Sequence, residues 1–292
     1  MSHFQPDRVL LEILKQNISD EAYSWLLEKS ASGKVSFNTT FVTIPRKTGK
    51  KNLAITQSQQ DLLAAYVPGF TVNHWLTDRL ARVWLLLQAD NSDKEKYVRQ
   101  IENLFLAAEV NELVALYSAL PLLAFPEVWI ARCSEGIRSN IGDVLEAIMC
   151  RNPYPAAYLS DPAWNQLVMK AFFTEKPVEE IVGLDKRANK DLALILRDYA
   201  HERWAAHRTV NPQIWRCVGK FIDEALLPDI EKLTISENVF DREAAALACN
   251  DSSYTPAKQL LDTIPVLKSA IQSGTLTWDL LALKMKENVL QS

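Results

Sequence analysis

The segment Asp191–Arg208, DLALILRDYAHERWAAHR, decides the fold class of this chain. At about 100° per residue its apolar side chains share one stripe of an amphipathic helix, formed by Leu192, Leu196, Tyr199 and Ala200. Arg203 and His207 fall within that stripe and are neighbours on a helix surface, because they are four residues apart. We therefore predict that both face inward, where a guanidinium requires an anion. A core carboxylate and an anionic ligand are the two candidate partners, and fraying at the helix end is the third explanation.

The same spacing of apolar residues extends along most of the chain and predicts further helices. They span about 7–29, as one helix or a helix pair, and Gln57–Tyr66, Val72–Gln88, Asp93–Ala107, Asn111–Leu120, Ile137–Cys150, Leu192–His207, Asp241–Cys249 and Thr277–Lys286. A capping residue followed by proline marks other helix starts, at Asp161-Pro162, Asn211-Pro212 and Thr255-Pro256. Only 8 of the 292 residues are glycine, which is few for a fold with many tight turns. We predict an all-α fold, with an irregular HEAT-like α-solenoid as first choice and a globular helical bundle as second.

The domain organisation follows from the absence of a linker rich in Pro, Gly or Ser between two halves. We predict a single α-helical domain over residues 1–292, interrupted by an irregular basic loop at about 30–52, in which FVTI at 41–44 could be extended. The basic turn lacks the glycine spacing of a phosphate-binding P-loop. It is either a solvated loop or a contact for phosphate, anionic lipid or an acidic partner, through Arg46, Lys47 and Lys50.

Charge and hydropathy restrict the class of function. A net charge of −4 argues against sequence-independent nucleic-acid binding, which usually needs a strong basic excess. The N-terminal residues lack the basic flank and unbroken apolar core of a secretory signal. No apolar run approaches the roughly 20 residues that a membrane span needs. We expect a soluble, cytoplasmic protein that does not span a membrane.

Cysteine and histidine are sparse and scattered. Cys133, Cys150, Cys217 and Cys249 form no CxxC pair, so we predict buried apolar fillers, with thiol chemistry or a disulfide as the alternative. The four histidines form no HExxH motif. We expect neither a catalytic metal nor a cofactor.

The candidate ligand-binding residues concentrate in one segment. Two prolines in RNPYP at 151–155 remove backbone donors and predict an irregular loop rather than a helix. We hypothesise that the loop Arg151–Tyr158 and the helices Trp164–Phe173 and Leu192–His207 wall one pocket. Its ligand-binding side chains would be Arg151, Asn152, Tyr154, Asn165, Lys170, Arg203 and His207. The alternative is a rigid loop pinned by Tyr154 and Trp164, with the polar groups consumed by internal salt bridges.

Several strings in the chain are too specific to arise from helical composition alone. They are the turn with Pro45, Arg46, Gly49 and Lys50, then RNPYP at 151–155, WNQLVMKAFF at 164–173, GLDKRAN at 183–189, LRDYAHERWAAHR at 196–208 and NPQIWRCVG at 211–219. In these strings the chain resembles the EboA family, bacterial proteins associated with moving small metabolites out of the cytoplasm. The resemblance implies a gene cluster that also encodes a UbiA-type membrane prenyltransferase and relatives of metabolic enzymes. It further implies a link to the export of secondary metabolites such as the scytonemin precursor.

The resemblance implies a pathway role rather than a reaction. We therefore expect an accessory or carrier protein in the export of a small hydrophobic or anionic metabolite or its precursor, without enzymatic activity. The UbiA-type prenyltransferase and other proteins of the cluster are the implied protein partners. One alternative is an enzyme acting on that intermediate, with His207, Arg203, Arg151 and Lys170 as acid–base and anion-holding groups. Another is a helical-repeat scaffold for pathway enzymes, which would use only its outer helical faces.

Overall fold

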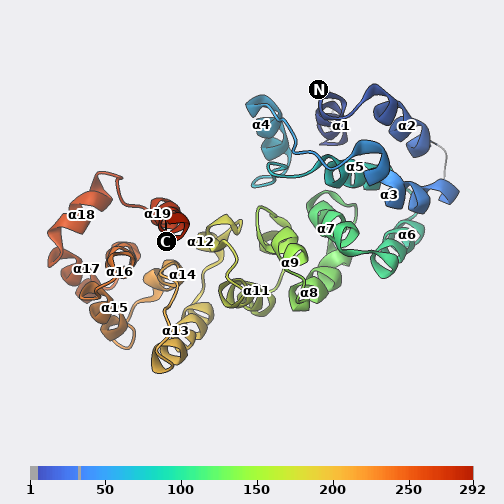
Figure 1. Cartoon of the computed structure of the whole chain (residues 1–292). Coiled ribbons are helices and arrows are strands. Elements are labelled where there is room, and N and C mark those ends of the chain that lie inside the picture. Colours follow the sequence, from blue (N-terminus) through green and yellow to red (C-terminus); the bar gives the residue numbers. More distant parts are fainter. Residues whose placement is uncertain (1–5, 32–33, 292) are drawn as a thin grey trace. The chain divides into compact units, whose positions relative to one another are not determined.

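A computed structural model describes residues 6–31 and 34–291 (Figure 1). These residues form nineteen α-helices and four 3-10 helices, with no strand among them, which confirms the all-α fold. The chain divides into two compact units, Met1–Ser160 and Asp161–Ser292. The predicted single domain stays a prediction.

Unit 1 is drawn from blue to green in Figure 1. Within it α5 packs against α1, α3 and α7, and α7 packs against α9. Its α-helices are α1 (Pro6–Asn17), α2 (Asp20–Ala31), α3 (Lys34–Thr48), α4 (Gln57–Tyr66), α5 (Thr77–Leu86), α6 (Lys94–Ala107), α7 (Val110–Ala119), α8 (Ile130–Arg138), α9 (Gly142–Met149) and α10 (Tyr154–Tyr158). The 3-10 helices η1 (Leu120–Leu122) and η2 (Pro126–Trp129) join α7 to α8.

Unit 2 continues the colour series to red, and its central helix α16 packs against α14, α15, α17 and α19. Its α-helices are α11 (Asp161–Phe173), α12 (Leu184–Arg187), α13 (Lys190–Ala205), α14 (Ile214–Val218), α15 (Leu227–Thr234), α16 (Val239–Asp251), α17 (Thr255–Asp262), α18 (Pro265–Gln272) and α19 (Trp278–Gln291). Its 3-10 helices are η3 (Val178–Glu180) and η4 (Gly219–Phe221).

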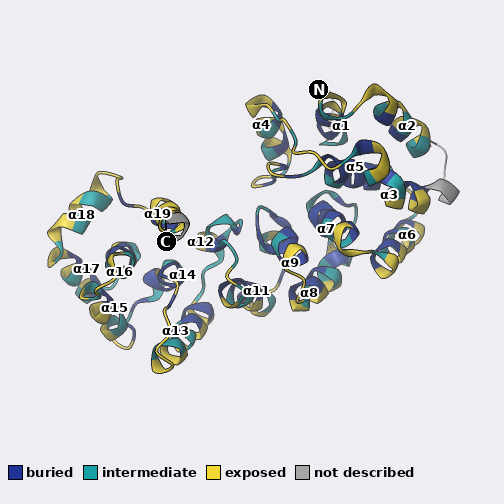
Figure 2. Cartoon of the chain, viewed as in Figure 1, coloured by how far each residue is buried: buried dark blue, intermediate teal, exposed yellow. Residues whose placement is uncertain are grey.

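The amphipathic pattern places the core of each unit. In Figure 2 the buried faces of the helices point toward neighbouring helices and the exposed faces point outward. On α13 the predicted apolar stripe is buried at Leu192, Leu196 and Ala200. On α16 the run of small residues from Ala244 to Cys249 is buried and allows close helix contact, as its sequence predicts.

The predicted irregular loop at about 30–52 is wrong for most of its length, because α3 occupies Lys34–Thr48; residues 32–33 lie outside the described part of the chain. The predicted extended piece FVTI is helical too. Phe37, Phe41, Ile44 and Thr48 are buried at three- and four-residue spacing, which is the helical period. The β-branched residues and Pro45 concealed that period, since they lower helix propensity.

Pro45 is accommodated inside α3 by a contact from another helix. Proline has no N–H, so the carbonyl of Phe41, four residues earlier, lacks its helical donor. The Nε of Arg82 on α5 donates to this oxygen over 3.1 Å. Arg82 also contacts Asp78 at 3.0 Å and Glu112 at 3.7 Å, and all three side chains are buried. The helical form of α3 therefore depends on an ion cluster in the core.

Other predicted boundaries are also corrected by the structure. The predicted helix Val72–Gln88 corresponds to α5, which begins only at Thr77. The predicted helix Ile137–Cys150 is split between α8 and α9 by residues 139–141. The prediction of an irregular loop at RNPYP is wrong in part, because α10 begins at Tyr154. Pro155 fits the first turn of this helix, where no N–H donor is needed. The helix expected to begin at Pro212 begins at Ile214, after a turn in which Asn211 Oδ1 accepts from Gln213 N at 2.9 Å.

All four cysteines are buried as thiols, which confirms their predicted role as core fillers. Burial raises the pKa of Cys133 and of Cys217 to about 12 and that of Cys249 to about 11. Since the thiolate is the reactive form, we expect no fast reaction of the native protein with a chromogenic disulfide reagent at mildly alkaline pH. The unfolded chain should release chromophore for all four thiols. Fast labelling of one thiol in the native state would contradict the buried arrangement.

Candidate functional site

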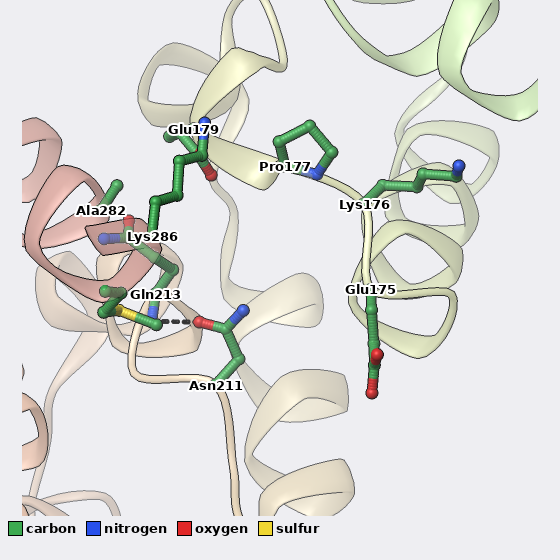
Figure 3. A pocket seen from close by; sticks show the side chains of 9 residues that line it. Glu175, Lys176, Pro177, Glu179, Asn211, Gln213, Ala282 and Lys286 are labelled. Atoms are coloured by element: carbon green, nitrogen blue, oxygen red, sulfur yellow. Dashed lines mark hydrogen bonds and ion pairs between the residues drawn. The ribbon is translucent and has the colours of Figure 1, made fainter. Parts of the chain in front are cut away.

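Two adjoining pockets lie in unit 2 between α19, the connection that follows α11, and the segment before α14. Figure 3 shows the first of them. The first has a volume of about 520 Å³ and the second about 460 Å³. Glu175, Asn211 and Met285 line both, so we treat the two as one groove and name it the α19 groove. The first pocket is completed by Lys176, Pro177, Glu179, Gln213, Ala282 and Lys286. The second is completed by Phe172, Tyr199, Arg203, Thr209, Val210, Pro212, Asn238, Phe240 and Asn288.

The groove combines apolar walls with a few fixed polar groups. Its carbon-rich lining comes from Pro177, Ala282 and Met285 in one pocket and from aromatic residues such as Phe172 and Phe240 in the other. At this volume and composition the groove can hold an organic molecule of metabolite size.

Lys286 is tied to one wall of the first pocket. Its Nζ lies 2.7 Å from Glu179 Oε1 and 3.6 Å from Glu180 Oε1, and Figure 3 shows the lysine reaching toward Glu179. The hydrogen bond to Glu179 is the main cause that raises the pKa of Lys286. The lysine charge is therefore balanced by protein carboxylates.

Gln213 presents an unused acceptor within the first pocket. Its side chain is 1% exposed, and its Nε2 donates to the carbonyl of Trp278 over 3.0 Å. That carbonyl can only accept, which fixes the orientation of the amide. Among the described residues no hydrogen-bond donor reaches Gln213 Oε1. A buried acceptor without a donor costs about 1–3 kcal/mol, so this position favours a ligand or water that donates.

Arg203 presents an unused cation in the second pocket. It is half-buried, its Nε donates to the Thr209 carbonyl over 2.5 Å, and its Nη1 lies 3.3 Å from the Tyr199 hydroxyl. Both of these acceptors are neutral, and Arg203 takes part in no ion pair within the described ranges 6–31 and 34–291. By contrast, Arg216 holds Asp185 at 2.6 Å and Arg197 holds Asp229 at 3.2 Å. Arg203 thus brings to the groove a positive charge that forms no ion pair among the described residues, although the exposed Glu175 lines the same pocket.

His207 does not face inward, and this part of the prediction is wrong. The helical wheel applies only while the helix continues, and α13 ends at Ala205. His207 follows with a positive φ of 55° and an exposed side chain. The bonds that close the helix end join Arg208 N to Arg203 O and Arg203 Nε to Thr209 O.

Three of the predicted ligand-binding side chains are engaged in bonds inside the protein. Asn152 is buried and donates to the carbonyls of Tyr117 at 3.1 Å and Ala147 at 2.9 Å. The Tyr154 hydroxyl donates to the Pro126 carbonyl at 2.5 Å. Asn165 exchanges two amide hydrogen bonds with Asn189, at 3.1 and 2.8 Å. These groups stabilise local structure, as the alternative explanation of the segment proposes.

The remaining candidates are divided between the two units. Unit 1 contains Arg151, which binds Glu146 at 3.2 Å, and the basic residues Arg46, Lys47 and Lys50, which are exposed. Unit 2 contains the half-buried Lys170 on α11. A single pocket walled by all three predicted segments stays a prediction, as do the ligand-binding roles of these residues.

Sequence reasoning did not single out Gln213 or Met285. Gln213 lies within the NPQIW string, so a signal was present in the motif. The helix that carries Met285 was predicted, but helical periodicity does not specify which distant segment a helix will face.

Two further properties of the described chain bear on its chemistry. Across residues 6–31 and 34–291, no three His, Cys, Asp or Glu side chains gather in a way that could hold a metal ion. No helix in the described part of the chain has the length and apolar character needed to cross a membrane.

Comparison with known proteins gives one match. Residues 7–219 match the family described as metabolite traffic protein EboA. No curated protein and no solved structure matches the chain. The matched range covers all of unit 1 from Asp7 onward and the part of unit 2 that carries Arg203 and Gln213. The chain belongs to the EboA family of metabolite traffic proteins.

Proposed function

We propose that the chain is a non-enzymatic carrier that holds a small metabolite in the α19 groove during its traffic. The metabolite has a largely apolar body that fits the carbon-rich walls. Its polar atoms include a donor for Gln213 Oε1 and an anionic or strongly accepting group for Arg203. Family membership supports the traffic role.

The observation that carries this proposal is the pair of unused polar groups in one groove. A surface hollow formed only by packing has no need of an arginine outside any ion pair in one pocket and a buried amide oxygen without a donor in the adjoining one. Buried polar groups in proteins are nearly always satisfied, so exceptions that line a pocket are candidates for ligand contact.

The finer parts of the proposal follow from the family. We infer that the traffic is export of a secondary metabolite or its precursor, and that the carrier works in the cytoplasm. It would deliver to, or receive from, a UbiA-type membrane prenyltransferase or another protein of the same cluster. Within unit 1, α5 packs against α7 and α7 against α9, which supports repeats of an irregular HEAT-like solenoid in this part, whereas α1 also packs against the more distant α4 and α5.

The direct test is mass spectrometry of small molecules retained by the natively purified protein. A fluorescent probe, anilinonaphthalene sulfonate, gives a second assay, since it combines flat apolar rings with one anionic group. Saturable binding of about one probe per chain is expected. A protein that retains no small molecule and binds no probe would contradict the proposal, whereas turnover of a retained molecule would support the enzyme alternative.

We expect Arg203→Gln to weaken probe binding about tenfold, which corresponds to the loss of one charge-assisted contact. The matched control is Arg208→Gln, because Arg208 is exposed and lines neither pocket of the groove. Arg203→Lys should retain part of the affinity, since it keeps the charge and loses the fork-shaped donor set. Equal weakening by the substitutions at 203 and 208 would show a general charge effect and contradict the role of the groove.

A further inference from the structure

A separate polar pocket lies in unit 1, with a volume of about 310 Å³. It is formed by the turn after α3, the start of α5, and parts of α7 and α9. Its lining residues are Lys50, His74, Leu76, Asp78, Arg79, Asn111, Val114, Asp143, Glu146 and Ala147. We name it the Arg79 pocket.

Arg79 is held rigidly in this pocket. Its guanidinium carbon lies 4.3 Å from the centre of the Trp75 ring, a cation–π distance. Its Nε donates to the Ser118 hydroxyl over 2.8 Å. The Ser118 hydroxyl donates its own hydrogen to the Val114 carbonyl, so it can only accept a hydrogen bond from Arg79. These contacts fix the plane of the guanidinium and use only one of its nitrogens.

The Trp75 ring, which forms a platform beneath Arg79, is itself held in place. Trp75 is buried and meets Phe70 edge-on at 5.7 Å between ring centres. Its carbonyl accepts from Leu53 N over 3.2 Å. A guanidinium on a fixed platform loses little side-chain entropy when it binds, which favours recognition of planar oxyanions.

The charge of Arg79 has no protein counter-ion among the described residues. The two carboxylates that act on its charge are engaged in other ion pairs: Asp78 binds Arg82 at 3.0 Å and Glu146 binds Arg151 at 3.2 Å. The pKa of Arg79 is lowered to about 10, mainly by burial and also by the positive charge of Arg151, against the opposing effect of Glu146 and Asp78. The group remains protonated near neutral pH, so an incoming anion would meet a full positive charge.

Lys50 supplies a second cation at the same pocket. Gly49 follows α3 with a φ of 72°. Lys51 is held against α5, because Thr77 N donates to the Lys51 carbonyl over 2.9 Å and Lys51 N donates to Thr77 Oγ1 over 3.2 Å. Lys50 lies between Gly49 and Lys51, and its exposed side chain stays adaptable.

Three carboxylates also line the pocket. Asp78 and Glu146 are paired with Arg82 and Arg151, and Asp143 is exposed and so screened by solvent.

We propose that the Arg79 pocket binds the carboxylate or phosphate group of a small anionic ligand, with Arg79 as the fork-shaped donor and Lys50 as the second cation. The site is independent of the α19 groove, since the two share no residue. It lies wholly inside the range that matches the EboA family, residues 7–219.

The test is calorimetric titration of the full chain with inorganic phosphate and, in a second arm, with acetate, at constant ionic strength set by chloride. Saturable binding of one anion per chain is expected, and the preferred probe identifies a phosphate or a carboxylate ligand. Arg79→Gln should weaken binding about tenfold, the usual scale for losing a bidentate charged contact. Lys50→Ala should weaken it about threefold, as expected for one partly exposed cation.

Three controls make the result decisive. Lys51→Ala removes an adjacent exposed lysine that does not line the pocket and should leave affinity unchanged. Asp143→Asn removes the exposed opposing charge and should strengthen binding. Arg203→Gln, in the α19 groove, should have no effect. If Arg79→Gln fails to fold, the substitutions at the exposed positions 50, 51 and 143 still test the proposal. Absence of saturable binding to both anions, or equal weakening by the substitutions at 50 and 51, would overturn the proposal.

Discussion

Replacing Arg82 with methionine is expected to lower the free energy of unfolding by about 3–5 kcal/mol, because it removes one partner from a buried ion cluster. Asp78 and Glu112 would be left as buried carboxylates without their cation, and the Phe41 carbonyl opposite Pro45 would lose its donor. Methionine matches much of the arginine side-chain volume, so the loss would come from charge and hydrogen bonding rather than from a cavity. Urea unfolding followed by circular dichroism measures the effect.

The matched control is Arg99→Met on α6, an exposed arginine, which should change stability by less than about 0.5 kcal/mol. A second variant that combines Arg82→Met with Asp78→Asn should recover part of the loss, since the two groups are coupled. If Arg82→Met unfolds at the same urea concentration as the control, the cluster is not a support of α3. Additive effects of the substitutions at 78 and 82 would lead to the same conclusion.

The Arg82 cluster also explains where sequence analysis failed. Periodicity identified α4 with its observed bounds, Gln57–Tyr66, because apolar spacing and local propensity agree there. In α3 they disagree: the buried spacing is helical, while the β-branched residues and Pro45 argue for a break. The deciding contribution is a hydrogen bond from Arg82, which is distant in sequence, and no local pattern specifies it.

The candidate site was predictable to a similar extent. Arg203 was singled out by its place in the apolar stripe of its helix, and it is half-buried and lines the groove. His207 failed because the prediction extended the helix past Ala205. Sequence analysis did not single out Arg79. A signal was present in its helix, α5, because Asp78 and Arg82 are four residues apart among apolar residues, which indicates charges directed at the core. What periodicity cannot supply is the identity of the partner segments, which here are the turn after α3 for Arg79 and α19 for Gln213.

Replacing Gly219 with alanine is expected to destabilise unit 2 by about 1–3 kcal/mol, through overpacking between η4 and α16. A Cβ at this position would lie 2.9 Å from the Cα and 3.0 Å from the carbonyl oxygen of Ala248, so backbone rather than a flexible side chain would have to move. Gly219 has helical dihedral angles, φ −49° and ψ −44°, for which alanine by itself is favoured by up to about 1 kcal/mol. A net loss of stability therefore requires that the steric clash exceed this gain.

Thermal unfolding of Gly219→Ala should show a melting temperature several degrees below that of the unsubstituted protein, the shift that a loss of this size produces in a chain of this length. Adding Ala248→Gly should not restore stability, because the clashing atoms belong to the backbone of residue 248 and remain after its side chain is removed. Gly136→Ala in unit 1 is the informative comparison, since its added Cβ would meet side-chain atoms of Ile148 at 2.4 Å and Tyr117 at 2.7 Å. There a second substitution, Ile148→Val, should relieve part of the loss by removing the Cδ1 atom. Rescue at 248 together with no rescue at 148 would show that the backbone of η4 and α16 is not in close contact, and that the small residues of α16 serve another purpose.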